Sequence, residues 1–239
     1  MRTTWQPLSN ETKPLTFLLV LTVLFLFTSS CSDNIQNAHD AYNKKDYKEA
    51  HKLFLSLATD GVAQAQNTLG LIYSNGQGVP QDNKEAVKWW RLAAEQGFAP
   101  AQTNLGWMYS KGQRVPQDDK EAIKWWRLAA EQGFSQAQNN LGVMYSKGLG
   151  VPQDDKEATK WWRLAAEQEF APAQYNLGVM YTNGQGVPKD SVSVHMWFSV
   201  AASNGNKDAV KNRNMLVEQM TPQQIEKAQE MARNWKPKK

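Results

Sequence analysis

The hydrophobic positions of this chain repeat every 36 residues over most of its length. The segment Lys84–Gln96 reads KEAVKWWRLAAEQ and returns almost unchanged at Lys120–Gln132 and Lys156–Gln168. The apolar residues of the first copy lie at helical spacing, and they are Ala86, Trp89, Trp90, Ala93 and Ala94. Each copy is therefore predicted to be an amphipathic helix with a heavy aromatic face.

A second apolar pattern with the same period lies between these aromatic helices. Its first copy contains Ala65, Leu69 and Tyr73, and it recurs three times. An eroded fourth copy of the aromatic helix covers Ser193–Asn204. The repeat unit is thus predicted to be a pair of helices, and a fixed period in this range is typical of a solenoid.

Glycine recurs at two kinds of position in the repeat. One lies inside the first helix, where glycine costs about 1 kcal/mol relative to alanine. Its return at Gly70, Gly106, Gly142 and Gly178 predicts a close backbone approach of the paired helix. The other kind ends each repeat, but Glu169 breaks the series of Gly97, Gly133 and Gly205, so that turn is expected to be tighter or displaced.

The loop GQGVPQD joins the two helices of the first copy. Gly76 is expected to end the first helix in the left-handed conformation, and Asp82 to cap the second helix. Together with the two apolar patterns, this loop resembles the Sel-1-like repeat, a tetratricopeptide-like unit, over roughly residues 37–205. The resemblance implies an all-α fold, a right-handed superhelix of antiparallel helix pairs that holds other proteins, and it implies no reaction.

The chain is predicted to contain a signal peptide, a tether, two caps and a repeat array. The signal peptide covers residues 1–30, a lipidated tether 31–36 and an N-terminal capping helix pair 37–61. Four repeats follow at 62–97, 98–133, 134–169 and 170–205. Capping helices and a basic tail occupy 206–239, because the last repeat of a solenoid needs its apolar face covered.

The N-terminal residues are typical of an export signal. Arg2 and Lys13 precede the apolar run Leu15–Phe27, whose 13 residues are fewer than the ~20 of a membrane span. The following residues, Thr28 to Cys31, resemble a bacterial lipobox, in which the cysteine carries the lipid. We expect an exported lipoprotein anchored through Cys31 in the cell envelope, at the outer membrane or the periplasmic face. Ordinary secretion and an uncleaved anchor are the alternatives.

The charge pattern and the cysteine content limit the range of possible functions. The net charge of +4 comes from basic and acidic residues interleaved at helical spacing, which is typical of a solvated face and not of a nucleic-acid site. Cys31 is the only cysteine, so no internal disulfide is possible. Cysteine-rich relatives of the resembled family have been credited with β-lactamase activity. A hydrolase of β-lactams or cell-wall peptides is therefore an alternative function.

Catalytic and metal-binding motifs are absent from the sequence. His39, His51 and His195 share no motif spacing, and no phosphate-binding loop or nucleophile elbow is present. We expect no catalytic residue, no metal and no cofactor. The function predicted is that of a non-catalytic scaffold, tethered to the bacterial envelope, that binds a protein or an extended peptide.

The binding residues are expected on the first helix of each pair, which lines the concave groove in tetratricopeptide-like arrays. Between its core positions lie Thr103, Asn104, Trp107, Lys111, Asn139, Asn140, Lys147, Tyr175 and Asn176. The asparagine series can clasp a peptide backbone through its amides or bond the neighbouring repeat. In a peptidoglycan- or glycan-binding module, the other alternative, Trp107 and Tyr175 would be stacking platforms.

Overall fold

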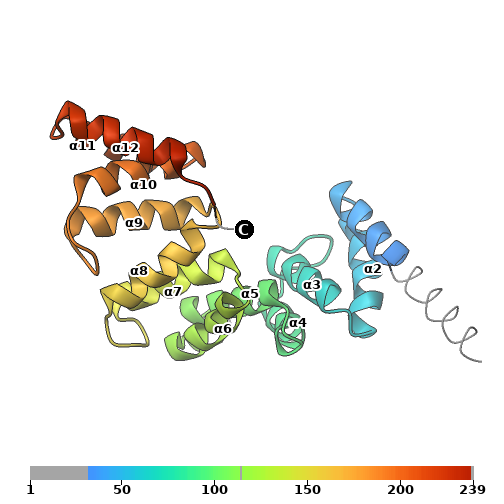
Figure 1. Cartoon of the computed structure of the whole chain (residues 1–239). Helices are drawn as coiled ribbons and strands as arrows, with labels where there is room; N and C mark the ends of the chain where they lie inside the picture. The colour runs from blue at the N-terminus through green and yellow to red at the C-terminus, as the bar shows by residue number, and fades with distance from the viewer. Residues whose placement is uncertain (1–31, 114, 238–239) are drawn as a thin grey trace, which may run out of the picture.

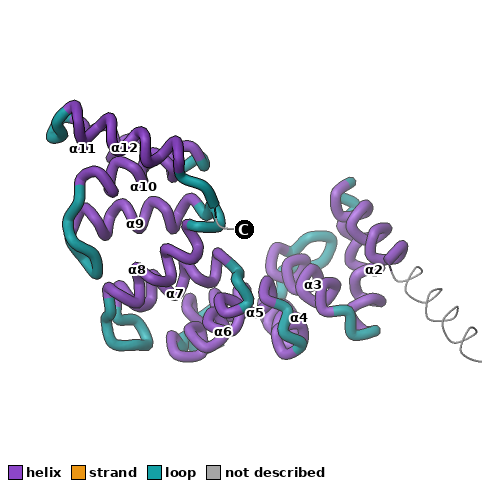
Figure 2. The backbone as a smooth tube through the Cα atoms, viewed as in Figure 1, coloured by secondary structure: helices purple, strands orange, loops and turns teal. Residues whose placement is uncertain are grey.

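The computed structural model describes residues 32–113 and 115–237, and the regular structure of these residues is entirely α-helical (Figure 2). Cys31 and the predicted export signal lie outside the described residues. None of the helices in the described ranges combines the length and the hydropathy that crossing a membrane requires. The all-α solenoid predicted from the repeat is confirmed.

The helices follow one another in antiparallel pairs. After helical residues 32–43 come α2 (Tyr47–Thr59), α3 (Ala63–Asn75), α4 (Asn83–Glu95), α5 (Ala99–Lys111), α6 (Asp119–Glu131), α7 (Ser135–Lys147), α8 (Asp155–Ala166), α9 (Ala171–Asn183), α10 (Ser191–Ser203), α11 (Lys207–Val217) and α12 (Pro222–Asn234). The stack curves from α2 at one end to α11 and α12 at the other (Figure 1). We call α3, α5, α7, α9 and α11 the first-helix row.

The second tryptophan of each aromatic pair locks the two helices of its repeat together. A Cβ added to Gly70 would lie 2.5 Å from Trp90 Nε1, and one on Gly106 would lie 2.6 Å from Trp126 Nε1. The Trp90 indole also donates a hydrogen bond of 3.1 Å to the Asn67 carbonyl. The close approach predicted from the helix glycines is therefore present, but the group that approaches is an indole ring and not a backbone.

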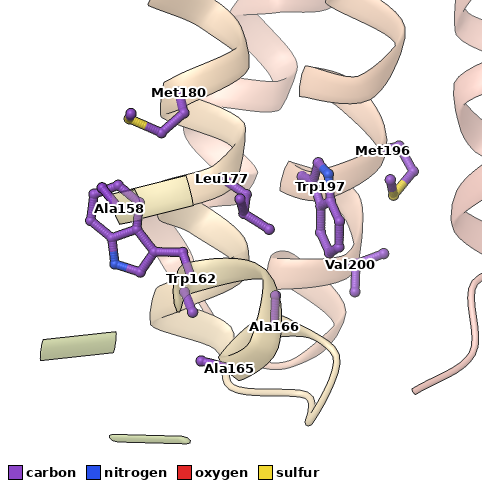
Figure 3. Close-up of a cluster of buried hydrophobic side chains, with 10 residues drawn as sticks. Ala158, Trp162, Ala165, Ala166, Leu177, Met180, Met196, Trp197 and Val200 are labelled. Carbon is purple, nitrogen blue, oxygen red and sulfur yellow. The ribbon is translucent and has the colours of Figure 1, made fainter. Parts of the chain in front are cut away.

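The first tryptophan of each pair packs against the preceding repeat instead. Trp89 belongs to the apolar cluster that contains Phe54 of α2, and Trp161 belongs to the cluster that contains Trp126 of α6. Figure 3 shows the last such cluster, in which Trp162 and Trp197 pack with Leu177. Apolar burial on this scale, with large rings contributed by neighbouring repeats, is what holds a solenoid together.

Buried glutamines add a polar link between repeats that the sequence analysis did not identify. Gln66 is 4% exposed, and its Nε2 donates to the Ala58 carbonyl of the preceding repeat at 3.1 Å. Its Oε1 accepts from Gln96 Nε2 at 2.7 Å. The same arrangement is centred on Gln102, Gln138 and Gln174. Because both functions of the amide are paired, burying it is not costly.

The loops have the predicted caps. Gly76 ends α3 with φ of 65°, and the Asp82 side chain accepts from the backbone N–H of Lys84 and Glu85 at 2.9 and 3.2 Å. The tighter or displaced turn expected at Glu169 is not present, because its N–H donates to the Ala166 carbonyl at 3.0 Å as that of Gly133 does to Ala130. α8 ends one residue earlier than α6, but α9 begins in register, 36 residues after α7. Glu169 itself adopts φ of 63°, the left-handed region that its glycine counterparts occupy.

The C-terminal helices cover the last aromatic helix. Thr221 and Gln224 form a capping box that starts α12. After that helix, the Trp235 ring meets the Trp197 ring edge to face, with centroids 6.2 Å apart. The apolar face of α10 is thereby covered from the C-terminal side.

Candidate binding groove

Hydrogen bonds between side chains connect neighbouring helices of the first-helix row. Asn104 Nδ2 donates to Asn67 Oδ1 at 3.1 Å, and Asn176 Nδ2 donates to Asn139 Oδ1 at 3.1 Å. Each bond joins residues 37 positions apart. We call this series the asparagine ladder. Of the two interpretations left open by the sequence, the structure shows the inter-repeat one for Asn104, Asn139 and Asn176, with a side chain as the partner.

The ladder is interrupted at Thr103. This residue is 2% exposed, and its hydroxyl donates to the Ala99 carbonyl of its own helix at 2.9 Å. Its assignment to the groove surface was wrong, because its short side chain bonds back to its own helix. The asparagines at the equivalent positions 67 and 139 bond to the next repeat instead. Asn140, the next rung, therefore makes no hydrogen bond to any described residue.

Asn140 opens into a cavity between α5 and α7, which we call the central pocket. Its volume is about 420 Å³, and it brings together four of the predicted binding residues, namely Trp107, Lys111, Asn140 and Lys147. Asp119 and Leu149 also line it. The pocket lies midway along the described array, between the second and third repeats (α5 and α7 in Figure 1).

The central pocket combines exposed apolar surface with positive charge. The Trp107 side chain is 42% exposed and that of Leu149 is 41% exposed. Lys111 and Lys147 end α5 and α7, and neither ammonium lies within 4.0 Å of a carboxylate of the described residues. Both lysines therefore have unused charge at the mouth of an apolar cavity.

A second cavity of about 420 Å³, the C-terminal pocket, lies between α9 and α11. It occupies the equivalent place two repeats on, so that Val179, Asn183 and Gln219 stand where Trp107, Lys111 and Lys147 line the central pocket. Tyr175 is in this pocket, but its hydroxyl accepts from Asn212 Nδ2 at 3.0 Å and its ring packs 5.6 Å from Phe198. Tyr175 is thus half-buried, and both its hydroxyl and its ring already contact other residues of the chain.

Leu149 and Asp119 are among the central-pocket residues that sequence reasoning missed. Leu149 stands where the other copies of the loop have Gln77, Gln113 and Gln185, so an apolar residue in a polar loop position was the available signal. Asp119 begins α6 and had no such signal, since an acidic residue in the first turn of a helix is accounted for by the helix dipole.

The histidines belong to packing contacts and not to a reactive site. His51 Nε2 lies 3.1 Å from the Tyr73 hydroxyl, and burial lowers the pKa of His51 and raises that of Tyr73. His195 is 3% exposed, and burial together with the charge of Arg213 lowers its pKa. Across the described ranges, no group of three or more His, Cys, Asp or Glu side chains lies close enough to hold a metal ion.

Comparison with solved structures supports the repeat assignment. A Sel1 repeat protein from Oxalobacter formigenes is 31% identical, with a TM-score of 0.72 over 84% of this chain and 85% of that one. A protective antigen of uropathogenic Escherichia coli strains with an SLR fold is 30% identical, with a TM-score of 0.52 over 78% of this chain and 48% of that one. A Sel1 repeat protein from Klebsiella pneumoniae subsp. pneumoniae is 21% identical, with a TM-score of 0.53 over 78% of this chain and 93% of that one.

The family model matches most of the chain. The chain has no significant match among curated proteins. The model of the Sel1 repeat, in contrast, matches five consecutive segments at residues 44–62, 63–98, 99–134, 135–170 and 171–206. The first segment contains α2, and the other four are helix pairs described above, so the chain belongs to the Sel1 repeat family.

Proposed function

We propose that this protein is a non-catalytic scaffold that holds an extended segment of a partner protein along its first-helix row. The observation that carries the proposal is the central pocket, where an exposed indole, an amide and two lysines line one cavity. Within the described part of the chain, the lysines have no carboxylate partner and the amide has no hydrogen-bond partner. Sel1 repeat proteins are generally protein-interaction scaffolds. The pocket supplies the place on this chain where such an interaction would be centred.

The side chains of the central pocket are those that contribute most at protein interfaces. Aromatic anchors at the centre of an interface, surrounded by polar groups, account for most of the binding energy in many complexes. Trp107 is not needed for packing, since the equivalent positions hold the smaller Leu71, Val143 and Val179. An exposed tryptophan that the fold does not require supports a binding role for this residue.

A peptide ligand fits the row better than a glycan does. A glycan-binding surface would need Trp107 and Tyr175 as open stacking platforms, but the Tyr175 ring already packs against Phe198. The amide of Asn140, by contrast, offers both a donor and an acceptor, which matches the two hydrogen-bonding groups of each peptide unit. These contacts favour an extended polypeptide as the ligand.

The envelope location is the second part of the proposal and rests on the sequence of residues 15–31. An apolar run of 13 residues followed by small residues and Cys31 supports export and lipid attachment. Lipidation at Cys31 would place the repeat array beside a membrane, within reach of other envelope proteins.

Site-specific photo-cross-linking tests the scaffold function. A photoreactive amino acid at Gln117, an exposed position lining the central pocket, should cross-link one partner protein in intact cells. The same amino acid at Leu92, which is 40% exposed on α4 and outside both pockets, serves as the control and should not. Equal cross-linking from both positions, or none from Gln117, would contradict the proposal, as would hydrolysis of a β-lactam by the purified protein.

A further inference from the structure

The central pocket also indicates which kind of segment it binds. We infer that its occupant is an extended acidic segment of the partner protein. An apolar side chain of this segment covers Trp107, and a neighbouring Asp or Glu carboxylate pairs with Lys111 and Lys147. This inference rests on the proposed scaffold function and adds the chemistry of the partner.

The charge of the pocket supports the acidic part of the inference. Three lysines of the aromatic helices are neutralised locally, since Lys88, Lys124 and Lys160 each pair with the glutamate three residues before them at 3.1–3.2 Å. Lys111 and Lys147 have no such partner among the described residues, and the one carboxylate of the pocket, Asp119, is more than 4.0 Å from both ammonium groups. A carboxylate entering the pocket would therefore meet two unpaired positive charges.

The lysines are also confined to this part of the row. The equivalent positions are neutral in the repeats on either side, with Asn75 before Lys111 and with Asn183 and Gln219 after Lys147. Two successive lysines thus lie on the two helices that form the central pocket, and the C-terminal pocket has neutral residues in their place. At these equivalent positions, positive charge is therefore confined to the central pocket.

The apolar and amide groups define the rest of the ligand. Trp107 and Leu149 present exposed apolar surface beside the lysines, so the segment needs an apolar side chain next to its carboxylate. The free amide of Asn140 can pair with a backbone unit of an extended chain. The row continues beyond this site to the C-terminal pocket, which leaves room for a segment that runs through, and this favours a side-chain carboxylate over a chain terminus.

Peptide selection with charge-reversed variants tests the inference. Random linear peptides displayed on phage are selected on the purified protein, on the variant Lys111→Glu/Lys147→Glu and on the control Lys84→Glu/Lys120→Glu. The control changes the net charge equally, at two exposed lysines outside the pocket. The protein and the control should enrich Asp or Glu beside an apolar residue, and the pocket variant should enrich Lys or Arg instead. Replacing the selected carboxylate by its amide should weaken binding by about tenfold or more.

Each other outcome has a definite meaning. Neutral selected peptides, or equal selection by the pocket variant, would overturn the inference. Peptides whose binding is abolished by amidating the C-terminus would also overturn it, because they would indicate capture of a terminal carboxylate. If Gln117 cross-links a partner and Lys111→Glu/Lys147→Glu leaves that cross-link unchanged, the scaffold function stands and only the inference fails. All four lysines are exposed, so matching melting curves of the variants confirm that folding is intact.

Discussion

The indole of Trp126 lies directly over the backbone of Gly106, with Nε1 only 2.6 Å from the place where a Cβ on that glycine would stand. Trp126 Nε1 also donates to the Thr103 carbonyl on the same helix, three residues before the glycine. The ring is therefore held in place by its steric contact with the glycine backbone and by one hydrogen bond. This pair of residues determines how closely α5 and α6 approach, and its equivalents do so in the repeats on either side.

The first prediction concerns whether an alanine substitution raises or lowers the stability of the protein. Gly106→Ala should destabilise the protein by about 1–3 kcal/mol, because the added methyl overlaps the ring, although alanine is ordinarily the better helix former by about 1 kcal/mol. Trp126→Ala alone should cost ~3–5 kcal/mol as a large-to-small change in the core. In the Trp126→Ala background, Gly106→Ala should become neutral or stabilising. Urea denaturation of the four proteins measures this, and a destabilisation of equal size in both backgrounds would refute the steric account.

The second prediction concerns the left-handed residue between the third and fourth repeats. Glu169 has φ of 63°, where a side chain costs about 1 kcal/mol relative to glycine. Glu169→Gly should therefore raise the free energy of unfolding by roughly 0.5–1 kcal/mol.

The reverse substitution is the matched control for this turn. Gly133 has φ of 88°, and a Cβ added there would meet nothing within 4 Å, so Gly133→Glu should lose stability through the backbone alone. Melting curves of both variants measure the effect. If Gly133→Glu is as stable as the parent protein, the left-handed conformation is not the cause.

The sequence predicted the helix pairs, the tryptophan core and the caps, because the 36-residue period repeats each apolar position several times. It did not predict the buried Gln66 and its equivalents, since a glutamine on a helix has the same appearance in sequence whether solvated or buried. The sequence could not decide, for a geometric reason, whether the asparagines bond a ligand or the neighbouring repeat. Whether Asn104 meets Asn67 or a ligand depends on how successive helices are offset, and the offset is a property of the whole stack.

The candidate site was predicted only in part for the same reason. Of the predicted positions between core residues, four share a pocket, namely Trp107, Lys111, Asn140 and Lys147. Thr103 is withdrawn from the groove because its hydroxyl bonds to the Ala99 carbonyl, a choice of partner that the residue pattern does not specify.

The third prediction concerns pH. His195 is buried, and both burial and the positive charge of Arg213 lower its pKa below the usual 6.5. Below about pH 6.5 the unfolded chain binds a proton there that the folded protein does not, so the stability contributed by the neutral imidazole falls as the pH falls. The loss should continue until the lower folded-state pKa is reached.

The measurement is the melting temperature from about pH 7 to about pH 5. The variant His195→Phe should show a weaker decrease over this range than the parent protein. His51→Gln is the comparison, since burial lowers the pKa of His51 in the same direction and its removal should also flatten the profile. A His195→Phe profile parallel to that of the parent would show that His195 is protonated in the folded state.

The fourth prediction concerns the N-terminus. If Cys31 carries a lipid, the cells should incorporate a clickable palmitate analogue into the protein, and Cys31→Ser should abolish both this labelling and the recovery of the protein with membranes. Asn34→Ala is a control that keeps Cys31 and the small residues before it. Absence of label from the parent protein would exclude lipidation, and the array would then have to reach its partner without this anchor.

The last prediction distinguishes the asparagines that bond the neighbouring repeat from Asn140, which does not. Asn104→Ala leaves the buried Asn67 without its partner and should cost about 0.5–1.5 kcal/mol of stability. Asn140→Ala breaks no hydrogen bond within the described residues, so it should leave stability nearly unchanged and weaken only the capture of the partner. Comparing melting with cross-linking from Gln117 distinguishes the two. Equal loss of stability would mean that Asn140 is also structural.

Thr103→Asn tests the role of Asn140 by adding the inter-repeat hydrogen bond that Asn140 lacks. Asparagine already occupies the equivalent positions 67 and 139, where it fits beneath the indoles of Trp90 and Trp162. At position 103 it should accept a hydrogen bond from Asn140 and complete the ladder, which stabilises the fold by about 0.5–1.5 kcal/mol. Because the same bond occupies the free amide of the central pocket, capture of the partner should weaken as stability rises. A variant that gains stability and binds its partner unchanged would show that Asn140 takes no part in recognition.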